Sequence, residues 1–252
     1  MARIMVITSG KGGVGKSTFV ALLGRHLAHL GQKVLMIDAD LGLKNLDVLM
    51  GLESRVIYDL EDVLKGRASL SQALVQDKVE EKLYLLPACI RLDVRQVDET
   101  FLIKIVNALD PTFDFILIDC PAGIEKGFHN AVQAAHEAIV IVTPDKTSLR
   151  DADKVIGLLK AQSMSEITYV LNRATKGPRI PSEELTRLLD VSSLGEIPMD
   201  VEIAKGQNYG LLLSSRCPGN RAIENIARKM VGAEMKEEHS LHRFFIKGKI
   251  RA

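Results

Sequence analysis

The fold of this chain is decided by the stretch Gly10-Lys11-Gly12-Gly13-Val14-Gly15-Lys16-Ser17-Thr18. Residues 4–8 before it form a short apolar run typical of a strand, and apolar residues after it recur with helical spacing until Gly31. A glycine-rich turn between a strand and a helix lets backbone N–H groups surround an anion, and the helix N-terminus adds partial positive charge. Lys16 would reach the β- and γ-phosphates, and the Ser17 hydroxyl would bind Mg²⁺. The stretch therefore predicts a nucleoside-triphosphate site.

Aspartates end two further strand-like runs. Residues 115–118 lead into Asp119, in a pattern that resembles a Walker B strand, whose aspartate holds Mg²⁺ through water. Residues 33–37 lead into Asp38, and Asp40 follows two residues later. An aspartate after a strand can also simply form a turn or cap a helix, and this alternative stays open for Asp38 and Asp40.

The same glycines allow a second interpretation. Gly10, Gly12 and Gly15 also spell G-x-G-x-x-G, and Asp38 lies where a dinucleotide-binding fold places its ribose-binding carboxylate. That interpretation leaves Lys16 and Asp119 unexplained. The triphosphate interpretation is therefore favoured.

Strand-like and helical runs alternate along the rest of the chain. Residues 138–142 and 167–171 are strand-like, and residues 149–159 have helical spacing. The 252 residues, 46% of them hydrophobic, supply a sizeable core, and no low-complexity linker divides them. The alternation predicts an α/β fold with a mostly parallel, doubly wound sheet covered on both faces. Ligands of such sheets bind outside the carboxyl ends of the strands, where the glycine loop, Asp38 and Asp119 fall.

Lys11 is unusual because a phosphate loop needs only one lysine. The motif G-K-G-G-V-G-K-S-T resembles the deviant Walker A motif of the MinD/ParA family of ATPases, which has the P-loop NTPase fold. Segments that resemble this family cover nearly the whole chain. They are residues 38–53, 57–60, 83–88, 119–125 and 150–159.

The resemblance implies an ATPase that depends on Mg²⁺ and dimerises on ATP. In such a dimer Lys11 would cross to the nucleotide of the partner and act as a catalytic cation beside Lys16. Asp40 would orient or deprotonate the attacking water, and Asp38 would support the metal held by Ser17 and Asp119. The implied nucleotide contacts are Gly10, Lys11, Gly12, Gly13, Val14, Gly15, Lys16, Ser17, Thr18 and, at the adenine, Asn172 and Arg173. Cys120 departs from the family, which usually carries serine there.

The C-terminal segment is basic and amphipathic. From His239 to Ala252 there are four cations and no acidic residue. On a helix, Leu241, Phe244 and Phe245 would share one face, and Arg243, Lys247 and Arg251 would form a stripe on another. Such a helix is suited to an anionic membrane interface. We predict an ATPase domain over residues 1–234 and a membrane-targeting tail over residues 235–252, with a frayed or docked tail as the alternative.

The resemblance also implies a role and partners. The role is placement of the division septum, and the partners are a second copy of the chain, a division inhibitor similar to MinC, and a topological factor similar to MinE or of another type. Their docking surface in the family includes the helix that begins near residues 150–153. The alternatives are a ParA-like DNA-segregating ATPase and a MinD-like regulator of flagellar number. The net charge of +1 gives no global reason to expect nucleic-acid binding.

Three scattered cysteines, Cys89, Cys120 and Cys217, suggest reduced thiols and not a disulfide framework. The first residues do not form a secretory signal, and no apolar run has the length of a membrane span. We therefore expect a cytoplasmic protein that binds the inner face of the cell membrane from one side.

Overall fold

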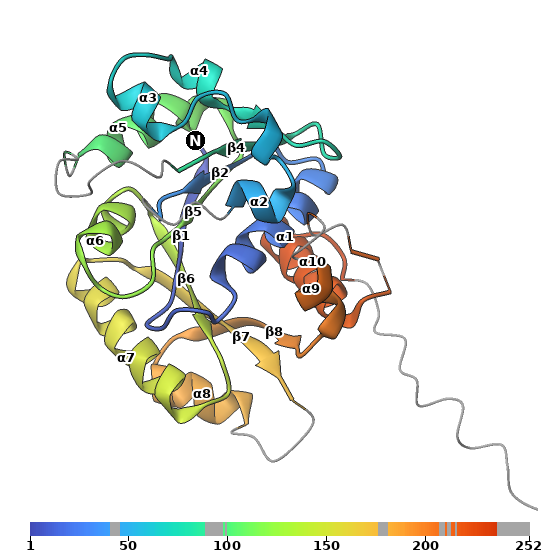
Figure 1. Ribbon diagram of the computed structural model, residues 1–252. Coiled ribbons are helices and arrows are strands. Elements are labelled where there is room, and N and C mark those ends of the chain that lie inside the picture. Colours follow the sequence, from blue (N-terminus) through green and yellow to red (C-terminus); the bar gives the residue numbers. More distant parts are fainter. Residues whose placement is uncertain are drawn as a thin grey trace, which may run out of the picture.

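The structure is a computed structural model that describes residues 1–40, 46–88, 98, 100–175, 181–206, 210, 213–214 and 216–235 (Figure 1). Its strands are β1 (Arg3–Thr8), β2 (Val34–Asp38), β3 (Val75–Gln76), β4 (Leu83–Leu86), β5 (Phe115–Asp119), β6 (Glu137–Val142), β7 (Glu166–Ala174) and β8 (Ser192–Pro198). They form one sheet in the order β3-β4-β2-β5-β1-β6-β7-β8. Every pair is parallel except β3 with β4. The mostly parallel sheet predicted from the sequence is confirmed.

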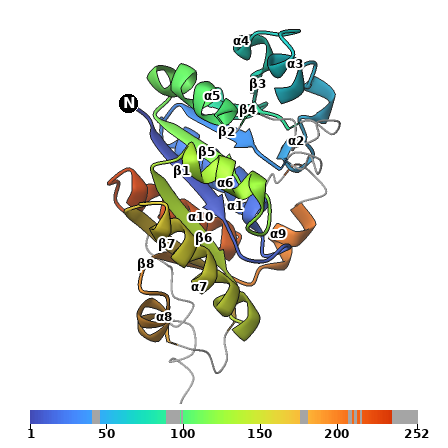
Figure 2. The same ribbon diagram turned by 90° about the vertical axis from the view of Figure 1, so that its left-hand side faces the viewer.

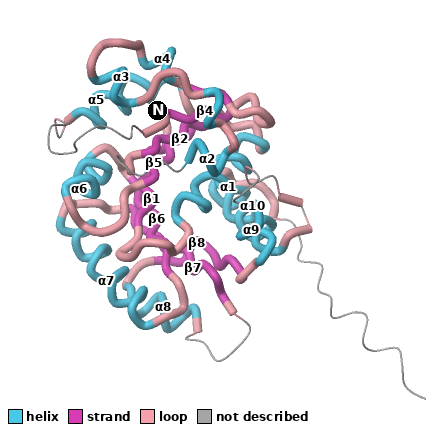
Figure 3. Tube along the Cα trace, viewed as in Figure 1, coloured by secondary structure: helices cyan, strands magenta, loops and turns pink. Residues whose placement is uncertain are grey.

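Helices cover both faces of this sheet (Figure 3). The α-helices are α1 (Lys16–His29), α2 (Leu46–Met50), α3 (Leu60–Leu64), α4 (Leu70–Ala73), α5 (Phe101–Leu109), α6 (Lys126–Gln133), α7 (Lys146–Ala161), α8 (Ser182–Leu189), α9 (Val201–Gly206) and α10 (Pro218–Met230). Two short 3-10 helices, Glu53–Arg55 and Asp110–Thr112, complete the described elements.

Alternate residues of each strand point to opposite faces and enter two separate cores. Val6 of β1 and Ile118 of β5 pack in the first core with α5, α6, α7 and α8. Met5 and Leu117, one residue earlier on the same strands, pack in the second core with α1, α2 and α10. In Figure 2, α5, α6 and α7 lie in front of the sheet, and α1 and α10 lie behind it. Burial on both faces explains why the central strands read as continuous apolar runs.

The strand register brings the predicted acidic residues to one edge. Asp38 at the end of β2 lies opposite Asp119 at the end of β5. Asp119 in turn lies opposite Ile7 of β1, two residues before Ser9 and the glycine loop. Because all three strands are parallel, their carboxyl ends meet at the same edge, and the loop and both carboxylates gather there.

Predicted and observed elements differ in small ways. The helix after the glycine loop ends at His29, two residues before Gly31, which has a positive φ of 93°. The antiparallel β3 is only two residues long, too short for its sequence pattern to predict a strand. Among the described residues, no helix has both the length and the apolar character needed to cross a membrane. The predicted membrane residues Leu241, Arg243, Phe244, Phe245 and Lys247 lie outside the described residues, and so does Cys89.

Candidate nucleotide-binding site

The glycine loop joins β1 to α1 and leaves the first N–H groups of the helix without a side-chain cap. Gly15 is the N-cap residue of α1, with a left-handed φ of 97°, and Gly13 is also left-handed, with a φ of 74°. Glycine adopts this conformation without steric cost. No side chain caps α1, so its uncapped N–H groups and its dipole are available to an anion. The loop therefore has the backbone geometry of an anion-binding turn.

The two lysines of the loop lie in different environments. Lys16 is buried, with 8% of its surface exposed, and its charge acts on Asp40 and Asp119. The Lys11 side chain is 46% exposed, and its Nζ lies 3.5 Å from Oδ1 of Asp145. Lys16 therefore lies inside the site of its own chain, whereas Lys11 lies at the rim, where solvent or another molecule can reach it.

Asp119 is buried beneath the loop. Its Oδ1 has no hydrogen-bond partner among the described residues. Burial raises the pKa of Asp119, and the neighbouring Asp38 carboxylate raises it further, while the Ser17 hydroxyl and the Lys16 ammonium group act in the opposite direction. A buried carboxylate oxygen without a partner is costly, so Asp119 is poised to accept a ligand or a cation.

Asp38 forms a turn as well as facing Asp119. Its Oδ1 accepts a hydrogen bond from the Asp40 N–H at 3.1 Å, and its Oδ2 accepts one from the Leu46 N–H at 3.2 Å. The turn-forming alternative is thus realised at Asp38, and the same carboxylate still influences Asp119. Burial raises the pKa of Asp40, and Lys16 opposes that rise. A raised pKa suits a carboxylate that accepts a proton.

These residues fit a magnesium ion whose ligands come partly from the protein and partly from phosphate. The described residues contain no group of three or more His, Cys, Asp or Glu side chains placed to hold a metal. Mg²⁺ does not need one, because it keeps several waters and binds through one or two protein oxygens plus phosphates. The unpartnered Oδ1 of Asp119 and the Ser17 hydroxyl are the oxygens available for it.

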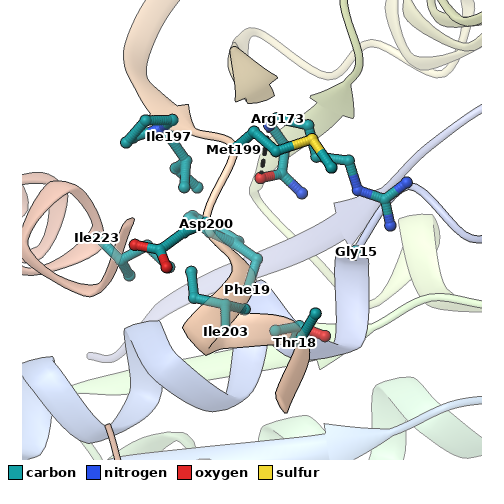
Figure 4. A pocket seen from close by; sticks show the side chains of 12 residues that line it. Gly15, Thr18, Phe19, Arg173, Ile197, Met199, Asp200, Ile203 and Ile223 are labelled. Carbon is teal, nitrogen blue, oxygen red and sulfur yellow. Dashed lines mark hydrogen bonds between the residues drawn. The ribbon is translucent and has the colours of Figure 1, made fainter. Parts of the chain in front are cut away.

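A pocket of about 180 Å³ opens beside the loop (Figure 4). Asn172 and Arg173, near the end of β7, line it. Asn172 Nδ2 donates to the Val14 carbonyl at 2.7 Å, and Arg173 Nη2 donates to the Gly13 carbonyl at 2.9 Å. Both side chains therefore also fix the loop. The remaining lining residues are Gly15, Thr18, Phe19, Ile197, Pro198, Met199, Asp200, Ile203, Ala204 and Ile223.

The pocket residues that follow β8, Asp200 among them, were not predicted from the sequence. Asp200 accepts hydrogen bonds through Oδ2 from the Gly219 N–H at 2.8 Å and from the Cys217 Sγ at 3.0 Å, so it caps α10 from outside that helix. Burial acts to raise the pKa of Asp200, but these bonds hold it below its ordinary value. Burial raises the pKa of the Cys217 thiol to about 11 and that of Cys120 to about 12. The sequence before Asp200 carries no comparable signal, because β8 reads Ser-Ser-Leu-Gly-Glu-Ile-Pro and is not a continuous apolar run like those that end in Asp38 and Asp119.

The start of α7 also contacts the glycine loop. Asp145 is the N-cap residue of α7, and its Oδ1 accepts from the Ser148 N–H at 2.9 Å. A Cβ atom on Gly10 would lie 2.5 Å from the carbonyl carbon of Asp151, so only glycine allows this approach. Arg150 and Asp153 in the same turns are exposed. The predicted docking segment thus belongs to a helix whose backbone abuts the loop.

Both the sequence and the fold have counterparts among known proteins. A family model described as an AAA domain matches residues 2–168. The septum site-determining protein MinD of Synechocystis sp. is 44% identical over 244 residues, which cover 93% of this chain and 91% of that protein. The MinC:MinD cell division protein complex of Aquifex aeolicus contains a chain with a TM-score of 0.85 and 40% identity, covering 94% of this chain and 99% of that one. MinD of Pyrococcus horikoshii, solved with Mg-ADP, has a TM-score of 0.83 and 34% identity, with coverages of 91% and 96%.

The contact between the loop and α7 generates a prediction. Replacing Gly10 with alanine should lower the free energy of unfolding of the nucleotide-free protein by about 1–3 kcal/mol, because backbone atoms of α7 must move to make room. The matched control is Gly12→Ala, whose new Cβ would lie 3.8 Å from its nearest neighbour, the Ala122 side chain. That variant should change the free energy by less than about 1 kcal/mol. Urea denaturation of both variants measures the difference, and equal stabilities would contradict the described packing.

Proposed function

The chain belongs to the MinD family of septum site-determining ATPases, and we propose that ATP binding controls its dimerisation and its reversible attachment to an anionic membrane surface. As an ATPase of this family, it takes part in placing the cell-division septum. The observation that carries the proposal is the contrast between buried Lys16 and half-exposed Lys11 in one loop. A lysine that its own site leaves at the rim is available to a second nucleotide.

Within one chain, the phosphate loop and Lys16 would bind the phosphates of ATP. Asp119 and the Ser17 hydroxyl would hold Mg²⁺, which neutralises charge on the phosphate oxygens when bound. Asp38 would support this arrangement through its hydrogen bonds to Asp40 and Leu46. Asp40, whose pKa burial raises, would orient the attacking water and accept its proton.

The pocket beside the loop would take the base of the nucleotide. Asn172 and Arg173 supply polar groups at its rim, and Ile197, Ile203 and Ile223 supply apolar surface. A pocket with apolar walls and a few fixed polar groups is typical of a site for a planar ring. Mg-ADP in the Pyrococcus horikoshii relative supports the same class of ligand for this chain.

In the partner's site, Lys11 would stabilise charge on the transferring phosphoryl group. Its present neighbour is Asp145, a half-exposed carboxylate at the start of α7. Hydrolysis would therefore require both dimerisation and release of Lys11 from Asp145. The adjoining turns of α7, which include Arg150 and Asp153, would form part of the surface for a MinC-like inhibitor and a MinE-like factor. The Aquifex aeolicus relative, which is solved with MinC, supports the first of these partners.

The basic tail would connect this cycle to the membrane. Each cation near anionic lipid contributes about 1 kcal/mol, and ordering of a tail consumes much of what its apolar side chains add. One tail of four cations is therefore marginal, whereas two tails in a dimer can bind on the order of 10²-fold more tightly. Because ATP drives dimerisation in this proposal, it would control membrane binding without contacting the tail.

The role of Lys11 can be tested through dimerisation. Lys11→Ala should weaken ATP-dependent dimerisation at least ~10-fold, because a charge-assisted contact with the partner's nucleotide is lost. The matched control is Asp145→Asn, which can still cap α7 but does not hold Lys11 by charge. That variant should dimerise as well as the native chain or up to about fivefold better, since an exposed ion pair contributes at most ~1 kcal/mol. Sedimentation equilibrium in Mg-ATP measures both, and native dimerisation by Lys11→Ala would contradict the proposal.

The membrane step can be tested with vesicles of anionic phospholipid. The full chain should pellet with them in ATP and remain largely in solution in ADP. A version that ends at Glu238 lacks the four cations and should stay in solution in both nucleotides. Equal pelleting of the full chain in ATP and ADP would contradict nucleotide control. If the full chain stays in solution in both states, the tail proposal fails, and DNA binding in ATP becomes the next function to test.

A further inference from the structure

Arg25 is a buried arginine on α1, nine residues beyond Lys16. Only 9% of its surface is exposed, and its partner Asp77 is 5% exposed. Burying a guanidinium group is costly unless hydrogen bonds replace its water, and a buried ion pair contributes little net stability. The role of such a group is therefore to hold in place the segments that its hydrogen bonds join.

The guanidinium group joins three separate segments to α1. Its Nη1 donates to the Gly210 carbonyl at 2.5 Å, and its Nη2 lies 3.3 Å from the Met50 carbonyl and 3.2 Å from Oδ2 of Asp77. Asp77 is itself held, because its Oδ1 accepts hydrogen bonds from the N–H groups of Val79 and Glu80 at 2.9 and 3.0 Å. The arginine is thus oriented by a fixed carboxylate, and its two terminal nitrogens also donate to two backbone carbonyls, whereas its buried Nε has no hydrogen-bond partner among the described residues.

One of those carbonyls belongs to the last residue of α2, and the first residue of α2 is hydrogen-bonded to Asp38 at the nucleotide site. The Leu46 N–H, at the start of α2, donates to Asp38, and the same carboxylate accepts from the Asp40 N–H. Helix α2 is therefore held between Asp38 at its first residue and Arg25 at its last residue, Met50. A shift of α2 would pull on the carboxylate that positions Asp40.

Gly210 packs closely against the end of α2, and its carbonyl also accepts a hydrogen bond from Arg25. Gly51 and Gly210 both have positive φ angles, of 64° and 73°. A Cβ atom on Gly210 would lie 3.3 Å from the Met50 carbonyl oxygen, and one on Gly51 would lie 3.6 Å from the Gly210 Cα. The two backbones meet without a side chain between them, and Arg25 donates to the carbonyl on each side.

We infer that Arg25 is a positioning residue for ATP hydrolysis: by holding the end of α2, it fixes the Asp38–Asp40 segment from the side remote from the nucleotide. It does not touch the reacting atoms. Its loss should therefore lower kcat and leave KM for ATP nearly unchanged, because the phosphate loop and the base pocket keep their contacts. This inference rests on the proposed roles of Asp38 and Asp40 in hydrolysis and does not depend on membrane attachment.

The test must separate positioning from stability. Arg25→Met alone leaves Asp77 buried without its partner and should lower the urea midpoint of unfolding strongly. The double variant Arg25→Met with Asp77→Asn removes both charges, and the amide oxygen can still accept from Val79 and Glu80. Its urea midpoint should return most of the way to that of the native chain. Its basal kcat, measured by phosphate release from the full chain in solution, should remain about tenfold low, with KM within about twofold.

Arg25→Lys provides a second variant that keeps the charge beside Asp77. A lysine ammonium group cannot serve two carbonyls and a carboxylate in the planar geometry of arginine, so kcat should again fall while KM is kept. Native kcat in either variant, at native KM, would overturn the inference and leave Arg25 a purely structural residue. A loss of kcat that follows the urea midpoint across the single, double and lysine variants would overturn it as well.

Discussion

The burial of Lys16 together with the carboxylates of Asp38 and Asp119, at a single edge of the sheet, is the constraint on which the rest of the structure depends. Each of these groups would be unfavourable if it were buried alone. Together the three groups carry more negative than positive charge. Burial and the neighbouring Asp38 carboxylate therefore raise the pKa of Asp119. In the proposed function, a divalent cation would relieve the repulsion between the carboxylates, and phosphate would accept hydrogen bonds from the loop and the start of α1. The two ligands together would complete this edge.

The sheet order makes this concentration of charge possible. β1 lies between β5 and β6, so the loop that follows it has Asp119 on one side and the start of α7 on the other. The β5 side carries the carboxylate proposed to hold Mg²⁺, and the α7 side carries Asp145, whose carboxylate lies 3.5 Å from the Lys11 ammonium group. The loop therefore lies between the residues proposed for hydrolysis and the surface proposed for partners.

Much of this site could be predicted from the sequence because it is encoded locally. A buried parallel strand reads as an apolar run, and a strand that ends in Asp119 or Asp38 marks the carboxyl edge without any knowledge of pairing. The contacts of Lys11 with Asp145 and of Arg25 with Asp77 join residues far apart in the chain and leave no periodic signal. Asp200 was missed for a related reason, since it caps α10 across a gap in sequence. At Asp38 the turn-forming alternative is compatible with the predicted role beside the metal, because one carboxylate forms the turn and also faces Asp119.

If Asp119 holds Mg²⁺ at the buried carboxylate edge, then Mg²⁺ must strengthen nucleotide binding through this residue. Calorimetric titration of ADP with and without Mg²⁺, in the native chain and in Asp119→Asn, measures that effect directly. We expect Mg²⁺ to tighten ADP binding to the native chain markedly, and Asp119→Asn to bind ADP alone about as well but to lose most of the gain from Mg²⁺. The same gain from Mg²⁺ in both proteins would show that the carboxylate edge does not hold the metal.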